Sequence, residues 1–183
     1  MSSIKKIYIC AVCIALCYVL PVAFHAVGLG AALSPMHLPV LLCGLVCGWP
    51  YGAVCGIVGP LLSSALTSMP PAAMLVHMVP ELCAYGLFAG LFLRLIRTGK
   101  LYADLYLAMV PAMLLGRVIA GLVRTVVFLS GAQGYSLALW VSSYFVESFP
   151  AMVLQLVVLP TLVVVLMKAR LIPERYGAQL RSA

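Results

Sequence analysis

Charge, and negative charge above all, is scarce in this sequence. Only 8% of the 183 residues are charged and only four are acidic, whereas 65% are hydrophobic. Soluble domains are about half apolar and about a quarter charged, so this composition excludes an ordinary soluble protein. A mean hydropathy of +1.18 is typical of a chain that crosses a membrane several times. We therefore expect a single integral membrane domain over residues 1–183.

Sequence motifs for nucleotide hydrolysis and for redox chemistry are also missing. No GxxxxGK[ST] motif occurs, so any ATP hydrolysis has to come from another protein. All seven cysteines lie in apolar runs, and Cys10 and Cys13 have a CxxC spacing without the strand–helix context of a redox motif. Cys10, Cys13 and Cys17 share a helix face, which leaves metal or thiol chemistry open, but small buried apolar side chains are the favoured interpretation. We expect no cofactor and no catalytic residue.

Every second connection between the apolar runs contains no Lys or Arg. Nine of the eleven fall into three clusters, within residues 5–6, 94–100 and 168–181. This asymmetry follows the positive-inside rule for a protein with both termini in the cytoplasm. The net charge of +7 therefore favours orientation in a lipid bilayer and contact with anionic headgroups. We expect no nucleic-acid partner.

The apolar runs predict an all-α membrane protein, a bundle of six transmembrane helices. A spanning helix requires about 20 residues, and the segment 38–66 is either one long span or two short ones. Pro50 between Gly48 and Gly52 favours a break, and only a break puts the 94–100 cluster on the same side as the termini. The expected spans are about 4–22, 38–48, 52–66, 72–95, 104–129 and 141–167.

Away from the span ends, four charged residues lie within the expected spans, namely Glu81, Arg117, Arg124 and Glu147. A charge at the bilayer centre costs at least ~2.5–3.5 kcal/mol, so we expect these side chains to face the bundle interior. Arg117 and Arg124 are seven residues apart and share a helix face, about 10 Å apart along the axis. The four residues either form part of a binding site or make two Arg–Glu pairs that only hold helices together.

The chemistry of these side chains indicates what such a site would bind. An Arg donates to a carboxylate or carbonyl, whereas a Glu accepts from an amide or amino group. A polar organic solute with both kinds of group fits this set better than a bare ion. His37 and His77, near the outer ends of helices, are further candidate substrate-binding residues. A metal site that they form with His25 is less favoured, because the spacing follows no ligand pattern.

Small residues four apart occur in four of the expected spans. The pairs are Ala11–Ala15, Gly44–Gly48, Gly52–Gly56 and Gly86–Gly90. Such pairs allow helix backbones to approach closely in a membrane, and we expect most of them to pack within the bundle. The first span carries no polar residue near its middle except thiols and Tyr8, so its alanine face is left for a partner helix.

Several stretches resemble the substrate-binding (S) components of energy-coupling factor (ECF) vitamin transporters. They are SPMHLPVLLCG at 34–44, GWPYG at 48–52, PLLSS at 60–64 and MPP at 69–71. Span count, length and cytoplasmic termini agree with that family, so the resemblance extends over nearly the whole chain. It implies a multi-pass protein of the bacterial plasma membrane that captures a small water-soluble micronutrient from outside with high affinity.

The resemblance also implies partners. In that family the S component associates with a transmembrane coupling protein and two ATPase subunits, and an alanine pair in the first helix faces the coupling protein. Ala11 and Ala15 match this pair. Relatives with this type of sequence handle pantothenate, folate, cobalamin, or queuosine and its precursors. The alternative function is a self-sufficient small channel or facilitator that uses the same four charges as a filter.

Overall fold

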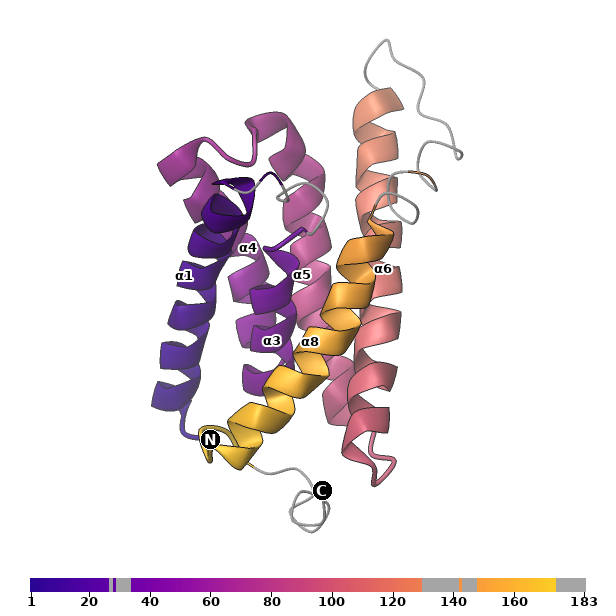
Figure 1. Cartoon of the computed structure of the whole chain (residues 1–183). Helices are drawn as coiled ribbons and strands as arrows, with labels where there is room; N and C mark the ends of the chain where they lie inside the picture. The colour runs from indigo at the N-terminus through magenta and orange to yellow at the C-terminus, as the bar shows by residue number, and fades with distance from the viewer. Residues whose placement is uncertain (27, 29–33, 130–141, 143–147, 174–183) are drawn as a thin grey trace.

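The computed structural model is an all-helical bundle (Figure 1). It describes residues 1–26, 28, 34–129, 142 and 148–173. Within these ranges the chain forms six helices and no strand. The helices are α1 (Ser3–Ala26), α3 (His37–Cys47), α4 (Trp49–Thr67), α5 (Ala72–Leu95), α6 (Leu101–Leu129) and α8 (Phe149–Lys168).

Five of these helices are long and apolar enough to cross a membrane, and α3 is the exception. It has 11 residues, which corresponds to roughly 16 Å, about half of a hydrocarbon core of ~30 Å. Figure 1 shows that α3 begins below the upper ends of α4 and α5. The expected span at 38–48 is therefore a short helix whose first residue, His37, lies inside the bundle.

The break predicted between the second and third spans is confirmed, and it consists of one residue. Gly48 has a φ of +95° and separates α3 from α4, a backbone conformation that a residue without Cβ adopts readily. Pro50 lies in the first turn of α4, where its missing N–H has no helical partner to lose. The helix consequently begins at Trp49, earlier than the predicted 52.

Helix α3 is central, because it packs against α1, α4, α5 and α8. Glycines allow its closest crossings. A Cβ on Gly44 would collide with the carbonyl oxygen of Gly86 on α5, and a Cβ on Gly86 would collide with that of Gly52 on α4. The predicted glycine pairs therefore pack within the bundle, where small residues substitute for a hydrophobic driving force.

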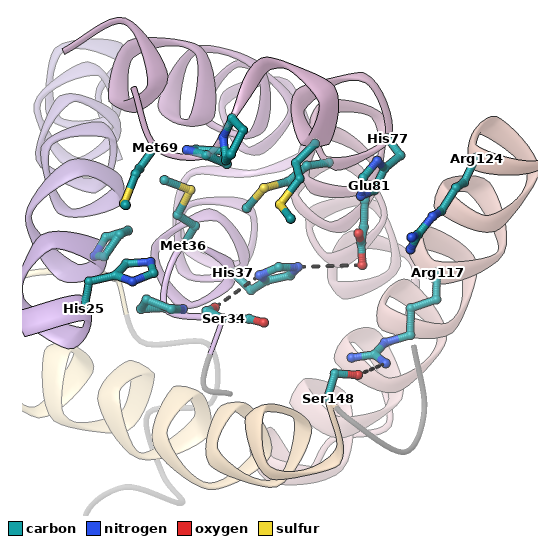
Figure 2. Close-up of a pocket in the computed structure, with 16 residues that line it drawn as sticks. His25, Ser34, Met36, His37, Met69, His77, Glu81, Arg117, Arg124 and Ser148 are labelled. Atoms are coloured by element: carbon teal, nitrogen blue, oxygen red, sulfur yellow. Dashed lines mark hydrogen bonds and ion pairs between the residues drawn. The ribbon is translucent and has the colours of Figure 1, made fainter. Parts of the chain in front are cut away.

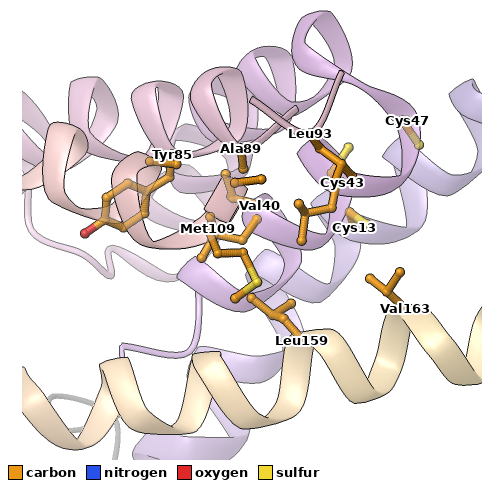
Figure 3. Close-up of a cluster of buried hydrophobic side chains, with 14 of the residues drawn as sticks. Cys13, Val40, Cys43, Cys47, Tyr85, Ala89, Leu93, Met109, Leu159 and Val163 are labelled. Atoms are coloured by element: carbon orange, nitrogen blue, oxygen red, sulfur yellow. The ribbon is translucent and has the colours of Figure 1, made fainter. Parts of the chain in front are cut away.

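The core between α3, α5, α6 and α8 is tightly filled. Val40, Tyr85, Met109 and Leu159 are fully buried there (Figure 3). The thiols of α1 also face inward, since the Cys10 thiol donates to the carbonyl of Tyr51 at 3.6 Å. All seven cysteines are free, and six of them are buried, whereas Cys83 is partly exposed. The six agree with the interpretation as small buried side chains.

The described parts of the three basic clusters lie at one end of the bundle. The start of α1, the connection between α5 and α6, and the end of α8 all lie at the lower end in Figure 1. Lys5 and Lys6, the cations of the 94–100 cluster, and Lys168 belong to these segments. The fold thus gathers the charges that the sequence separates.

Candidate functional site

A cavity of about 470 Å³ lies at the other end of the bundle. Its walls come from the end of α1, the start of α3, the connection between α4 and α5, the first half of α5 and the second half of α6, with Ser148 before α8 (Figure 2). The side chains with ionisable or hydroxyl groups are His25, Ser34, His37, His77, Glu81, Arg117, Arg124 and Ser148.

The remainder of the lining is methionine and proline. These residues are Met36, Met69, Met74 and Met78, with Pro21, Pro35, Pro70 and Pro71. Methionine is unbranched and polarisable, so it adapts to the shape of an apolar or aromatic surface, whereas the proline rings are rigid. A solute in the cavity would therefore meet both polar groups and adaptable apolar surface.

Glu81 is the acidic group of the cavity among the described residues, and it is 6% exposed. One of its carboxylate oxygens lies 3.7 Å from Nε2 of His37, at the start of α3. The other ring nitrogen of His37, Nδ1, is 3.1 Å from the carbonyl oxygen of Ser34. Both nitrogens of His37 therefore face oxygen acceptors, and α3 is tied to α5 through the buried carboxylate.

Tyr85 joins Glu81 to Arg117. Its hydroxyl donates to Oε1 of Glu81 at 3.1 Å and accepts from Nε of Arg117 at 3.1 Å. Nη1 of Arg117 also donates to the hydroxyl of Ser148. Hydrogen bonds thus connect α5, α6 and the residue before α8, and the 3.7 Å contact between His37 and Glu81 extends this polar chain to α3. Such a chain lowers the cost of burying charge in an apolar environment.

The position of Tyr85 depends on Gly116. A Cβ on Gly116 of α6 would collide with the Tyr85 ring, so the absence of a side chain there lets the ring lie between α5 and α6. Arg117, the next residue, is thereby brought to the tyrosine hydroxyl, with its own side chain 3% exposed. Gly116 thus leaves space for the Tyr85 ring, and Arg117 donates a hydrogen bond to the Tyr85 hydroxyl.

Five of the six residues predicted for substrate binding line the cavity. They are His37, His77, Glu81, Arg117 and Arg124. Glu147, the sixth, lies outside the residues that the structure describes. Figure 2 shows Arg117 and Arg124 on one face of α6 and directed towards the cavity, as their spacing of seven predicted. Their role in binding a solute remains a prediction.

Sequence reasoning missed the residues that connect these charges. Tyr85 lies four residues after Glu81, on the same helix face, and a tyrosine in the middle of a span needs a partner for its hydroxyl. That spacing was the available signal. Nothing comparable marks Ser34 or Ser148, because their contacts depend on how α3 and α8 dock.

The histidines do not form a metal site in the part of the chain that is described. His25, His37 and His77 all line the cavity, but no group of three or more His, Cys, Asp or Glu in the described ranges is arranged to hold a metal ion. The arrangement is suited to a polar organic solute, which can donate to Glu81 and accept from the arginines.

Comparison with known proteins places most of the chain in one family. Residues 5–163 match the model of the family described as ECF transporter, substrate-specific component. No curated protein and no solved structure matched the chain.

Proposed function

The chain belongs to the substrate-specific components of ECF transporters, and from this premise we propose that its cavity captures a small water-soluble micronutrient for ATP-driven import. A subunit of this family is a transporter component and not an enzyme. The five long apolar helices agree with a multi-pass membrane protein. The observation that carries the proposal is a cavity large enough for a small solute, lined by His37, Glu81 and Arg117. The buried Tyr85 connects Glu81 to Arg117 beside it.

The class of solute follows from the lining. Glu81 offers an acceptor for an amide or amino group, and Arg117 and Arg124 offer donors for a carboxylate or carbonyl. The methionines offer adaptable contact to an apolar or planar part. A vitamin or modified nucleobase, of the size of pantothenate, folate or a queuosine precursor, has this combination.

The proposed partners are a transmembrane coupling protein and two ATPase subunits. The sequence itself has no Walker-type motif, so nucleotide hydrolysis has to be supplied by those subunits. We place all the basic clusters and both termini in the cytoplasm of a bacterial cell, with six passes through the plasma membrane. The cavity then opens to the outside.

The proposed docking surface is the exposed face of α1. Ala11 and Ala15 are exposed there, between the exposed side chains of Tyr8 and Val19. The opposite face of the helix, with Cys13 and Cys17, is buried against the bundle. Two alanines at a spacing of four provide a flat surface that a helix of the coupling protein can approach closely.

Conduction through the chain alone is the rival function, and the core argues against it. Val40, Leu41 and Leu159 are fully buried at the centre of the bundle, so packed side chains fill the region that a pore would need. The discriminating experiment is reconstitution of the purified chain in liposomes. We expect solute binding without flux until the coupling protein and the ATPases are added with ATP. Flux through the chain alone would reject the proposal.

A further inference from the structure

A second groove lies at the end of the bundle where the basic clusters meet. It measures about 550 Å³ and is formed where α1 begins and the chain leaves α8. Ser2 and Lys5 line one side, and residues 170–173 line the other. Neither substrate capture nor docking through α1 uses this groove.

The chain after α8 is held in a fixed conformation. The N–H groups of Leu171 and Ile172 both donate to the carbonyl of Leu166, at 3.0 and 3.4 Å. The side chain of Ile172 is buried, with 5% exposed, and belongs to the hydrophobic core. This turn anchors the segment to the bundle, and so it fixes the position of Arg170 at the rim of the groove.

Arg170 adopts a backbone conformation that usually belongs to glycine. Its φ is +56°, in the left-handed region that helix-terminating glycines occupy. For a residue with a Cβ, this conformation costs about 1–2 kcal/mol. A backbone outlier at a structured position motivates a search for what its side chain does.

The other wall of the groove contributes a second cation, Lys5, and the hydroxyl group of Ser2. Lys5 lies in the first turn of α1, where its backbone N–H is 3.4 Å from Oγ of Ser2. No acidic side chain is present among the described residues that line the groove. The side chains that line the groove therefore offer one guanidinium, one ammonium and one hydroxyl, a set that suits a phosphate group.

Exposed apolar side chains lie beside the groove, which is at the ends of two candidate membrane spans. The membrane-spanning segments of α1 and α8 both end here, at Ser3 and Lys168. Beside the cations, Ile4 is 66% and Leu171 is 58% exposed. An anion with hydrocarbon attached would satisfy both kinds of surface, whereas a free anion would leave the apolar part uncovered.

We propose that this groove binds the phosphate headgroup of an anionic phospholipid, between Lys5 and Arg170. The main packing partners of α1 are α3 and α4, and those of α8 are α3 and α6. A bound headgroup would therefore connect the first and the last helix of the bundle at a point where they have few direct contacts. Its acyl chains would cover Ile4 and Leu171.

The test compares retention of lipid by the full chain and by charge variants. Each protein is reconstituted in nanodiscs of phosphatidylcholine with or without phosphatidylglycerol, then extracted and weighed by native mass spectrometry. We expect the wild type to retain phosphatidylglycerol, and Lys5→Gln and Arg170→Gly to retain it about fivefold less each, the effect of one cation near an anionic lipid. Arg170→Gly also relieves the strained backbone, so its thermal stability without the lipid should not fall.

Lys100→Gln is the matched control, because it removes one charge at the same end but outside the groove. An equal loss of lipid in Lys100→Gln would reject a defined site in favour of diffuse attraction. Equal retention of lipid by wild type and Arg170→Gly would also reject a defined site.

A second experiment adds inorganic phosphate to the protein in neutral detergent and measures thermal stability. Stabilisation of the wild type by phosphate, absent in Arg170→Gly, would assign the groove to free phosphate and overturn the lipid.

Discussion

Tyr85 connects the two buried charges of the cavity through one hydroxyl group. The hydroxyl donates to Glu81 and accepts from Arg117, while the ring fills the space beside Gly116. If the carboxylate and the guanidinium are presented to a solute, their orientation depends on this bridge. A purely structural pairing would depend on it as well, so the two roles have to be separated by measuring both binding and stability.

Tyr85→Phe keeps the ring and removes the bridge. We expect binding of the captured solute to weaken by about 1.5–3 kcal/mol, as for loss of a hydrogen bond to a charged group. Isothermal titration with the solute identified from the wild-type protein provides the affinity. Tyr102→Phe, at an exposed tyrosine in the first turn of α6, is the control and should leave affinity unchanged. Unchanged affinity in Tyr85→Phe with a lower unfolding temperature would support structural pairing alone.

Gln155 is a buried amide with no hydrogen-bond partner among the described residues. The residue is 1% exposed, and neither side-chain atom has a partner within the described chain. Mutational data on proteins give a cost of about 1–3 kcal/mol for burial of an amide that has no hydrogen bond. Gln155→Leu should therefore raise the unfolding free energy by about 1 kcal/mol or more, measured as a higher unfolding temperature in detergent. A lower unfolding temperature would show that the amide is satisfied in the folded protein.

Helix α5 has to approach α3 and α4 closely for the site to form. It carries Glu81 at the cavity, and its Gly86 lies at the crossing with Gly44 of α3 and Gly52 of α4. The crossing sets the distance between α5 and α3, and hence the separation of Glu81 from His37. Packing at this glycine and geometry in the cavity are therefore coupled.

Gly86→Leu tests that coupling. The new side chain would meet the backbone of α4, which cannot move aside as a side chain can, so we expect a loss of at least about 1–3 kcal/mol of stability together with weaker solute binding. Ala73→Leu, at an exposed position of the same helix, is the matched control for added volume. Unfolding temperature and affinity are measured for both variants. Normal behaviour of Gly86→Leu would contradict the close crossing.

The elements show where sequence reasoning succeeded. The charge clusters and the Gly48–Gly52 segment together predicted two helices where hydropathy alone allowed one. Pro50 was taken as part of the break, yet proline fits the first turn of a helix, and so α4 begins earlier. The spacing of Arg117 and Arg124 predicted their common face, because that depends on one helix only.

Contacts between helices could not be predicted in the same way. Whether Glu81 reaches His37 or Arg117 depends on the rotation of α5 relative to its neighbours, and a single sequence does not specify that rotation. The bridge through Tyr85 depends further on the missing side chain at Gly116 of another helix. Candidate residues were therefore identifiable from the sequence, but their connections were not.

At the scale of the whole molecule, the cavity and the alanine face of α1 are separate surfaces. The cavity meets α1 only near its end, at Pro21 and His25, whereas Ala11 and Ala15 lie in the middle of its exposed face. Capture and docking should therefore be separable by mutation. This separation is what a subunit that binds its solute first and joins its transporter afterwards requires.

Ala15→Trp is expected to abolish transport by the complete transporter while solute binding to the isolated chain is retained. The bulky side chain would prevent close approach of a partner helix and lies outside the cavity. Val157→Trp, at a residue that is 62% exposed on α8, is the control for added surface bulk. Uptake of labelled solute and affinity are measured side by side. Equal loss of binding and uptake in Ala15→Trp would reject the docking role.

The central claim is that the cavity around Glu81, Tyr85 and Arg117 holds the transported solute. Mass spectrometry of small molecules released from purified wild-type protein and from Arg117→Ala, prepared in parallel, tests it most directly. The account predicts a polar organic solute in the wild type that is absent or at least about tenfold depleted in Arg117→Ala, since loss of a buried charge-assisted bond costs about 1.5–3 kcal/mol. The same solute at the same occupancy in both proteins would contradict it.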